Sequence, residues 1–414
     1  MRVLILNQAF YPDTVSTAQH ASDLASGLAS RGHSVTVVAS RRGYDDPQRR
    51  FPKHELWREV EVRRIACTGF GKKAKWRRAV DFSTFMMSCA GRVLVSPRFD
   101  IIVAMTSPPL ISSLAALFVP LRASYLVSWV MDLNPDEAIA AGWLKAGSLG
   151  AKILRRSLNL SLRRAVRVIV LDRFMRDRLV AKRVPERKIT IIPPWSHNEH
   201  VRFDPEGRDD FRRRHGLTGK FVVMYAGNHS PCHPPDILLE AATGLRNREE
   251  IVFCFVGGGS EFGRLKRYAS ANTMSNTVFL PYEPLQKLAG VLSSADLHVV
   301  LMGDAFPGIV HPCKIYNILS VGIPLLYVGP SQSHLHEIVD RLRGAGHAYS
   351  SASGAVNDVI ENVLVAAGKK AGSVAEHREA SVDFSQEVLL PRFIGELENL
   401  PIPVMSAGAQ SARE

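Results

Sequence analysis

At 414 residues the chain is too long for one ordinary hydrophobic core, so we expect two domains of roughly 200 residues each. A hydrophobic content of 46% excludes a disordered protein, and five cysteines without a CxxC pair exclude a disulfide framework and favour a reducing, cytoplasmic compartment. The net charge of +13 is uneven: residues 1–194 contain 32 Lys and Arg against 15 Asp and Glu, whereas residues 195–414 contain 20 against 24. The first half of the chain is therefore expected to meet an acidic partner.

The first half alternates strand-like runs with helical patterns. Residues 3–6 and 35–40 are apolar runs typical of buried strands, and Ser16 or Thr17 is expected to cap a helix between them. Four later runs each pass from a strand into a polar or proline-marked loop: "DIIVAMTSPP", "ASYLVSWVMD", "RVIVLD" and "KITIIPPW". This order predicts a parallel sheet whose ligands lie at the carboxyl ends of the strands.

The second half begins with a charged, turn-rich segment, residues 198–219, that is typical of a linker and a short helix. A second series of strands, each followed by a loop and a helical pattern, comes next: "FVVMYAGN", "IVFCFVGGG", "TVFLPY", "LHVVLMG" and "IPLLYVG". The fold class is therefore predicted to be α/β, with two Rossmann-like domains in tandem. The stretch from about Leu400 is rich in proline and small residues, and we expect it to be disordered.

One loop-to-helix junction, "PGIVHPCKIYNILSVGIP" at residues 307–324, predicts an anion site. Lys314 stands where the helical pattern begins, and Gly308 leaves backbone room in the loop before it. Because a helix N-terminus already favours negative charge, a lysine there favours a bound anion. Asn317, one turn later, would face the same direction and suits a hydroxyl. The alternative is a lysine paired with a nearby carboxylate.

Two other strand ends in the second half carry weaker signals. The loop "VGGGSEFG" (256–263) can bring backbone amides close to a phosphate, although a tight strand-to-helix turn explains it equally well. In "AGNHSPCHPPD" (226–236), Asn228, His229 and Ser230 are candidates for donors into a crevice. The rival interpretation is a metal site with soft ligands, namely His229, Cys232, His233, His311 and Cys313. Their spacing matches no zinc pattern, so a rigid loop shaped by prolines and histidines is favoured over metal.

In the first half, "VMDLNPDEA" (130–138) follows a strand and places Asp132 where a carboxylate would point into the crevice. Such a carboxylate can orient or deprotonate a hydroxyl. A helix cap, or a partner for one of the many arginines, is the alternative interpretation of Asp132.

Two cationic segments carry apolar residues: "GKKAKWRRAVDFSTFMMSCAGRVL" (71–94) and "KILRRSLNLSLRRAVRVIV" (152–170). Basic residues with aromatics indicate a membrane interface, so an anionic membrane surface is a candidate partner. No recognition motif supports nucleic acid. An ordinary helix with a solvated basic face is the alternative.

A set of motifs in fixed order resembles the family-4 glycosyltransferases, within them the branch that builds O-antigen, capsule and colanic-acid-type polysaccharides. The motifs are "FYPDTVSTAQHASDLASGLASRGHSVTVVAS", "TSPP", "DLNP", "RRAVRVIVLDRFMRDRL", "KITIIPPW", "MYAGN", "VGGG" and "CKIYNILSVGIP". The resemblance implies a GT-B fold, in which two Rossmann-like domains face each other across a cleft. It implies an acceptor-binding domain at 1–197, a nucleotide-sugar-binding domain at 198–383, a return helix at 384–400 onto the first domain, and a tail at 401–414.

The resemblance also implies a reaction: a sugar passes from a nucleotide-sugar donor to a lipid-linked or saccharide acceptor, with retained configuration and without metal or other cofactor. Asp132 and Lys314 would be catalytic. The implied donor-binding residues are Asn228, His229, Gly257, Gly258, Gly308, Ile309, Val310 and Asn317, and the implied acceptor-side residues are Ser16, Thr17 and Ser107. Family acceptors are often membrane lipid diphosphate sugars, so attachment at the inner face of the plasma membrane is expected to be peripheral.

The sequence departs from the family pattern at three places. Many relatives carry two glutamates where this chain has Ile309 and Asn317, and a glycine pair where it has Val15-Ser16-Thr17. The usual arginine and lysine of the donor loop are also absent, with His229 and His233 nearby. Two other functions on the same architecture therefore stay open: a nucleotide-sugar isomerase resembling the 2-epimerases, and a non-catalytic scaffold.

Overall fold

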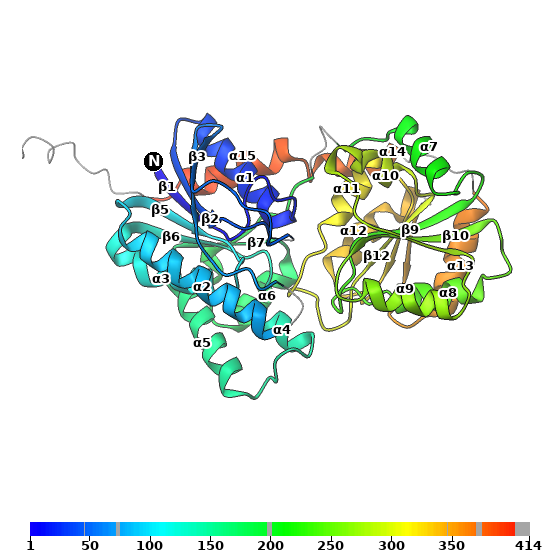
Figure 1. Ribbon diagram of the computed structural model, residues 1–414, viewed down its shortest axis with the longest axis horizontal. Helices are drawn as coiled ribbons and strands as arrows, with labels where there is room; N and C mark the ends of the chain where they lie inside the picture. Colours follow the sequence, from blue (N-terminus) through cyan, green and yellow to red (C-terminus); the bar gives the residue numbers. More distant parts are fainter. Residues whose placement is uncertain (45, 72–74, 197–200, 346, 370–374, 402–414) are drawn as a thin grey trace, which may run out of the picture.

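Two parallel β-sheets, each packed between helices, lie side by side in the computed structural model of the protein (Figure 1). The structure describes residues 1–44, 46–71, 75–196, 201–345, 347–369 and 375–401. We call the part built on the eight-stranded sheet the first domain and the part built on the six-stranded sheet the second domain. The expected boundary at 197/198 and all but the first residue of the expected tail lie outside the described residues.

The first sheet has the strand order β3-β4-β2-β1-β5-β6-β7-β8, and every neighbouring pair is parallel except β3 with β4. Its central strands are almost entirely apolar because helices cover both faces of the sheet. The strands are β1 (Arg2–Leu6), β2 (Ser34–Ser40), β3 (His54–Trp57), β4 (Val60–Ile65), β5 (Phe99–Ala104), β6 (Ala123–Trp129), β7 (Arg167–Val170) and β8 (Ile189–Ile191).

The helices of the first domain are α1 (Ser16–Ser30), α2 (Lys75–Leu94), α3 (Ile111–Arg122), α4 (Asp136–Ala140), α5 (Leu149–Arg164), α6 (Arg173–Ala181) and the short η1 (Glu186–Lys188). The expected cap of α1 is wrong. Val15 occupies the N-cap position without a side-chain hydrogen bond, and Ser16 is already helical. Helix α1 instead forms because small apolar residues at helical spacing are buried on the sheet, namely Ala18, Ala21, Leu24, Ala25 and Leu28.

The second sheet is parallel throughout, with the order β11-β10-β9-β12-β13-β14. Its strands are β9 (Phe221–Asn228), β10 (Ile251–Gly258), β11 (Thr277–Leu280), β12 (Leu297–Leu301), β13 (Leu325–Val328) and β14 (Ala348–Ser351). Its helices are α7 (Pro205–Arg214), α8 (Asp236–Gly244), α9 (Phe262–Ala271), η2 (Leu285–Lys287), α10 (Leu288–Ser293), α11 (Lys314–Val321), α12 (His334–Leu342), η3 (Arg343–Ala345), α13 (Val356–Ala367) and α14 (Ala375–Val382), and the chain continues into α15 (Gln386–Glu398).

In each sheet the strand order reverses at one point, between β1 and β5 in the first domain and between β9 and β12 in the second. Loops that leave the carboxyl ends of two such strands diverge and open a crevice in doubly wound folds. The loops after β1, β5, β9 and β12 therefore hold the positions from which a ligand would be contacted.

The last helix, α15, returns to the first domain and lies against α1 (Figure 1). Leu389, Phe393, Ile394 and Leu397 are buried in the same core as the central strands of the first sheet. Of the helices in the part of the chain that the structure describes, none combines the length and apolarity needed to cross a bilayer.

Helix α7 is fastened to the second domain by one buried carboxylate. Asp296, 4% exposed, accepts hydrogen bonds from Arg208 (2.6 Å), Arg212 (2.5 Å) and the Val222 backbone N–H (2.8 Å). Removing this carboxylate would take the opposite charge away from two guanidinium groups, which otherwise donate to backbone carbonyl oxygens, and an acceptor away from one backbone N–H.

We predict that Asp296→Ala lowers the free energy of unfolding by about 3–5 kcal/mol, because it leaves buried charges without compensation. Asp210, which pairs with Arg214 at 2.9 Å but is about half exposed, provides the matched control. Asp210→Ala should change stability by less than about 1 kcal/mol. Urea unfolding of the two variants checks this, and equal losses would contradict the prediction.

Candidate active site

The ends of β9 and β10 approach each other so closely that only glycine fits. Gly257 has φ +129°, and a β-carbon there would lie 2.2 Å from the Gly227 carbonyl oxygen. A β-carbon at Gly258 would lie 3.2 Å from the ring of Tyr282. Contacts within the protein therefore explain why glycine stands at both of these positions, which we expected to contact the donor.

His229 holds these two strand ends together. It is fully buried, and its Nδ1 lies 3.0 Å from the Gly227 carbonyl oxygen and 3.2 Å from that of Gly258. Burial and the charge of Lys314 lower its pKa to about 4, so the imidazole is neutral and donates from Nδ1. Its Nε2 is buried without a hydrogen-bond partner among the described residues. Asn228, the last residue of β9, is exposed at the strand end.

Lys314 is the first residue of α11, which no side chain caps. Its ammonium lies 3.7 Å from the centre of the Tyr225 ring and against Gly227. Nζ is buried, forms no hydrogen bond and has no acidic partner among the described residues. Burial lowers its pKa to about 7. A cation at an uncapped helix start, beside an aromatic face and near His229, His233 and His298 but with no acidic partner among the described residues, is arranged to receive an anion.

The loop before α11 contacts the first domain. Gly308 has φ +69°, and a β-carbon there would lie 2.5 Å from the carbonyl carbon of Phe174. The Ile309 carbonyl oxygen accepts a hydrogen bond from the Leu133 N–H at 2.8 Å, and the side chains of Ile309 and Val310 are buried. These three positions, which we expected at the donor, therefore lie in the contact between the domains. Asn317 stays partly exposed on α11 and bonds to no other described side chain.

Two carboxylates of the first domain lie close to the loops of the second. Burial and the neighbouring Glu137 carboxylate raise the pKa of Asp132 to about 8, and burial raises that of Glu137 as well. Glu137 accepts a hydrogen bond from Asn134 (2.8 Å) and lies 4.0 Å from the Cys232 thiol. Asp132 is close enough to the Cys313 thiol for its charge to raise the pKa of that group. Asp132 thus faces the residue that precedes Lys314.

The residues expected on the acceptor side lie at the carboxyl ends of the first sheet. Burial raises the pKa of the Cys313 thiol, and the Ser16 hydroxyl, which acts as a donor to its sulfur across the domains, lowers it. The thiol itself donates to the His311 carbonyl oxygen at 3.2 Å, and Ser16 Oγ lies 3.3 Å from His20 Nδ1. Thr17 is bound through its carbonyl oxygen to Asn7, and Ser107 through its carbonyl oxygen to Gln8. A small cavity of about 40 Å³ opens at the same edge, lined by Gln8, Ser40, Arg42, Thr68, Arg78 and Phe82 among others.

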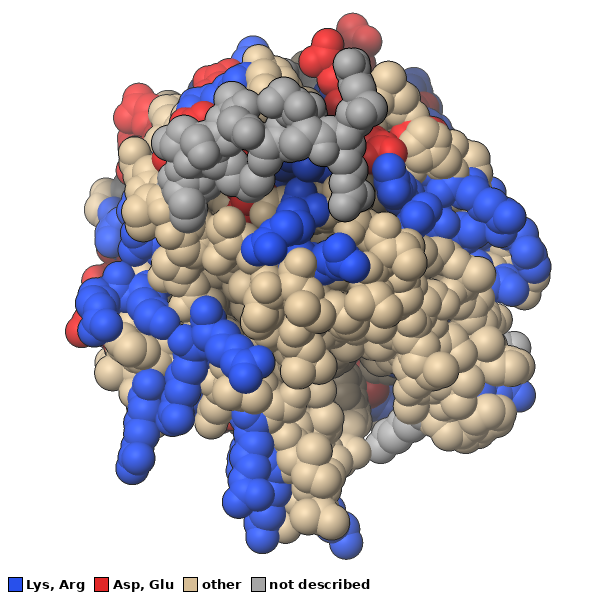
Figure 2. Space-filling view, turned by 90° about the vertical axis from the view of Figure 1, so that its left-hand side faces the viewer, with Lys and Arg blue, Asp and Glu red and all other residues tan. Residues whose placement is uncertain are grey.

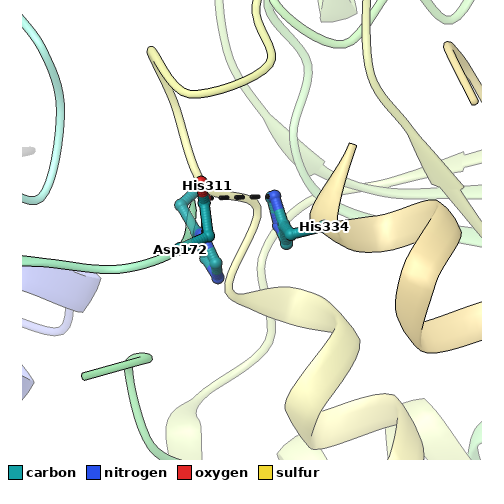
Figure 3. A group of neighbouring side chains, drawn as sticks. All are labelled: Asp172, His311 and His334. Atoms are coloured by element: carbon teal, nitrogen blue, oxygen red, sulfur yellow. Dashed lines mark hydrogen bonds and ion pairs between the residues drawn. The ribbon is translucent and has the colours of Figure 1, made fainter. Parts of the chain in front are cut away.

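A cluster of three buried side chains joins the domains (Figure 3). Asp172, the N-cap of α6, lies 2.7 Å from His311 Nδ1 and 3.3 Å from His334 Nδ1. Burial alone would raise the pKa of Asp172, but the hydrogen bond from His311 and the charges of both histidines lower it to about 2. Burial, followed by the charge of His311, lowers the pKa of His334 well below its ordinary value.

The ligand atoms of this cluster lie within 4.8 Å of one another, which is compatible with a metal site. The two imidazole rings, however, are stacked at 3.7 Å and only 8° from parallel. A metal ion lies in the plane of each imidazole that binds it, so two stacked rings cannot both bind one ion. His311 is also occupied at both nitrogens, by Asp172 and by the Tyr316 hydroxyl (2.6 Å). The arrangement fits a hydrogen-bonded link between domains better than a metal centre.

Two family models match the chain in the order of its two domains. The model for a glycosyl transferase 4-like domain covers residues 17–195, and that for glycosyl transferases group 1 covers residues 207–345. Together they span well over half of the chain. The chain belongs to the family-4 glycosyltransferases.

Individual proteins agree with this family. The glycosyltransferase is 22% identical over 404 residues to the putative colanic acid biosynthesis glycosyl transferase WcaI of Escherichia coli (strain K12), across 94% of this chain and 96% of that protein. Its similarity to this relative agrees with the branch that builds polysaccharides.

Solved structures show the same GT-B fold. Sucrose-phosphate synthase from Thermosynechococcus elongatus superposes with a TM-score of 0.76 at 13% identity, covering 96% of this chain and 98% of that one. Anabaena HepE, solved in complex with UDP-glucose, gives a TM-score of 0.70 at 15% identity, covering 97% and 100%. The predicted architecture of two Rossmann-like domains is thereby confirmed.

Two residues near the candidate site of the glycosyltransferase were not anticipated: Tyr225 below the Lys314 ammonium and Glu137 beside Asp132. Cys313, which was considered only as a metal ligand, lies beside Ser16. Glu137 belongs to the same "DLNPDEA" loop as Asp132, so the sequence could have indicated that the two carboxylates are neighbours. Tyr225 lies inside an apolar strand, so no local pattern marks it as part of a site.

We predict that His334→Phe flattens the pH dependence of stability of the glycosyltransferase in mild acid. Since the pKa of His334 is lower in the folded than in the unfolded protein, the unfolded state binds the extra proton and stability falls as pH drops below about 6.5. That loss, at most about 1.4 kcal/mol per pH unit, should be absent from the variant. Unfolding at several pH values, with His336→Phe on the same helix as control, checks this; identical slopes for wild type and His334→Phe would refute it.

Proposed function

We propose that this glycosyltransferase moves a hexose from a nucleotide-sugar to a lipid-linked or saccharide acceptor during cell-surface polysaccharide synthesis. We further propose that it retains the anomeric configuration and uses no metal. The observation that carries the proposal is the buried Lys314 ammonium, which has no acidic partner among the described residues and lies at the uncapped start of α11. The donor diphosphate would supply the missing negative charge.

On the donor side, Lys314 and the backbone N–H groups at the start of α11 would stabilise the charge that develops on the leaving diphosphate. The Tyr225 ring and Gly227 fix the lysine in place, so little reorganisation is needed when the anion arrives. Asn228, exposed at the end of β9, and Asn317, partly exposed within α11, are proposed to bind donor hydroxyls. The UDP-glucose complex of Anabaena HepE supports a donor of this class.

On the acceptor side, Asp132 is the proposed group for the attacking hydroxyl. With a pKa raised to about 8, its carboxyl keeps a proton near neutral pH and orients the hydroxyl through hydrogen bonds. The cavity beside Arg42 and Arg78 would accept the acceptor's anionic part. Both proposals place the acceptor at the carboxyl edge of the first sheet.

We predict that Lys314→Met lowers sugar transfer by a factor of about 100 to 1,000, the usual cost of removing one preorganised charge-stabilising group. Thermal shift with UDP-, GDP- and dTDP-sugars first identifies the donor, because a bound ligand raises the melting temperature. Release of the nucleoside diphosphate is then measured with a membrane extract as the source of acceptor.

Lys266→Met, at an exposed lysine of α9, is the control for this experiment. Normal transfer by a folded Lys314→Met variant would remove Lys314 from the mechanism. Conversion of the nucleotide-sugar without any acceptor would favour an isomerase, and binding of no nucleotide would favour a non-catalytic scaffold.

We also predict that diphosphate binding takes up a proton. The free ammonium has a pKa of about 7, and a bound dianion would raise it, so affinity should fall as pH rises above about 7. At about pH 8.5, where the phosphate of the free nucleotide is already ionised, titration calorimetry in two buffers of different ionisation enthalpy should reveal uptake of up to one proton. The Lys314→Met variant should bind the diphosphate without taking up a proton. Proton uptake that persists in this variant would mean that another group binds the proton.

A further inference from the structure

Three helices on one face of the first sheet carry large apolar side chains that point outward. Helices α2, α3 and α5 pack side by side there (Figure 1). Met87 is 74% exposed, Leu117 63% and Leu149 73%. The complete set of large exposed apolar residues on these helices is Trp76, Met87, Leu94, Leu117, Leu121, Leu149, Ile153 and Leu160. We call this surface the α2–α3–α5 face.

The spacing on α5 shows that these residues form an ordered row. Leu149, Ile153 and Leu160 are separated by four and seven positions, which places them along one side of the helix. Leu158 and Leu162 are buried on the sheet side. A surface helix needs only one apolar stripe to pack on its own core. The outward row on α5 is therefore free to contact another molecule or a membrane.

Helices α3 and α5 of this face carry basic but no acidic residues, and the carboxylate of Asp81 on α2 is bound to Thr68, Phe70 and Gly71. Residues 101–131 and 138–171 contain no Asp or Glu. Lys152, Arg156 and Arg163 project from α5 and form no ion pair with another residue that the structure describes. Figure 2, which views this end of the molecule, shows blue and tan over most of its lower half, with the red side chains gathered mainly at its upper edge.

We propose that the α2–α3–α5 face docks on an anionic lipid bilayer. The outward apolar side chains enter the boundary between head groups and acyl chains, while the surrounding Lys and Arg bind lipid phosphates. A second copy of the chain fits less well, because pairing this face with itself would oppose basic side chains to basic side chains. The inference stands on the surface alone and does not depend on sugar transfer.

Docking in this way explains where the cavity of the first domain lies. Arg78 and Phe82, which line the cavity, are residues of α2 and belong to the same helix as the exposed Trp76 and Met87. A bilayer held by this helix would lie next to the cavity. An acceptor with a membrane-embedded tail could then reach the cavity without leaving the lipid.

The test is co-sedimentation of the full chain with vesicles of phosphatidylcholine alone or with about 30% phosphatidylglycerol, at low and high salt. We expect binding only to the anionic vesicles, weakened by salt. The variant Lys152→Glu/Arg156→Glu/Arg163→Glu should lower the partition coefficient at least about a hundredfold, since each basic residue near such a surface contributes roughly fivefold. The variant Leu149→Ser/Ile153→Ser/Leu160→Ser should also lower the partition coefficient, although its charge is the same as that of the wild type.

A matched control lies on the second domain, where Lys266, Arg267 and Tyr268 of α9 are all exposed. Lys266→Glu/Arg267→Glu/Tyr268→Ser should bind vesicles like the wild type. Equal binding to neutral vesicles, or equal losses from the α5 and α9 variants, would overturn the proposal, as would a dimer in solution that the α5 changes dissociate. Nucleotides should raise the melting temperature of every variant by the same amount as that of the wild type. If no nucleotide binds, the proposed sugar transfer is contradicted, but the proposed membrane docking is not.

Discussion

The arrangement of the whole molecule depends on one short segment, residues 307–314, that contacts the first domain and then opens α11 in the second. Its backbone packs against Phe174 at Gly308 and accepts a hydrogen bond from Leu133 at Ile309. Its His311 is bound to Asp172. Because Lys314 follows immediately, the contacts that hold the domains together also determine where the unpaired ammonium lies. The position of the Lys314 ammonium is therefore tied through a few covalent bonds to the contacts between the domains.

Alternating apolar runs and polar loops were sufficient to predict most strands of both sheets, since buried parallel strands are continuous hydrophobic segments. The strands that were not anticipated are β3, β4 and β14. In β3 and β4 charged residues interrupt the apolar pattern, as in "VEVRRI", because they lie near the edge of the sheet and one side of each strand meets solvent. Edge strands of this kind resemble polar loops when only the sequence is considered.

The candidate site was predicted in part, for a related reason. Lys314 was singled out because it stands at the start of a helix, and Asp132 because it follows a strand whose loop lies at the carboxyl edge of the sheet; their catalytic roles stay predictions. Local patterns do not distinguish a glycine that makes room for a ligand from one that makes room for its own protein. Gly257 and Gly308 are of the second kind. Tyr225 is a site residue only because β9 lies beside the start of α11, a relationship between distant segments that no short motif contains.

The return of α15 to the first domain has a consequence for how the protein is made. Phe393 and Leu397 belong to a core that also contains the opening strands of the chain. During synthesis those strands leave the ribosome long before α15 does, and part of their apolar surface stays uncovered until α15 has been made. The strands of the second domain are contiguous in sequence, so this domain does not have to wait for a distant segment to be synthesised. The amino-terminal half of this enzyme is thus synthesised first and completed last.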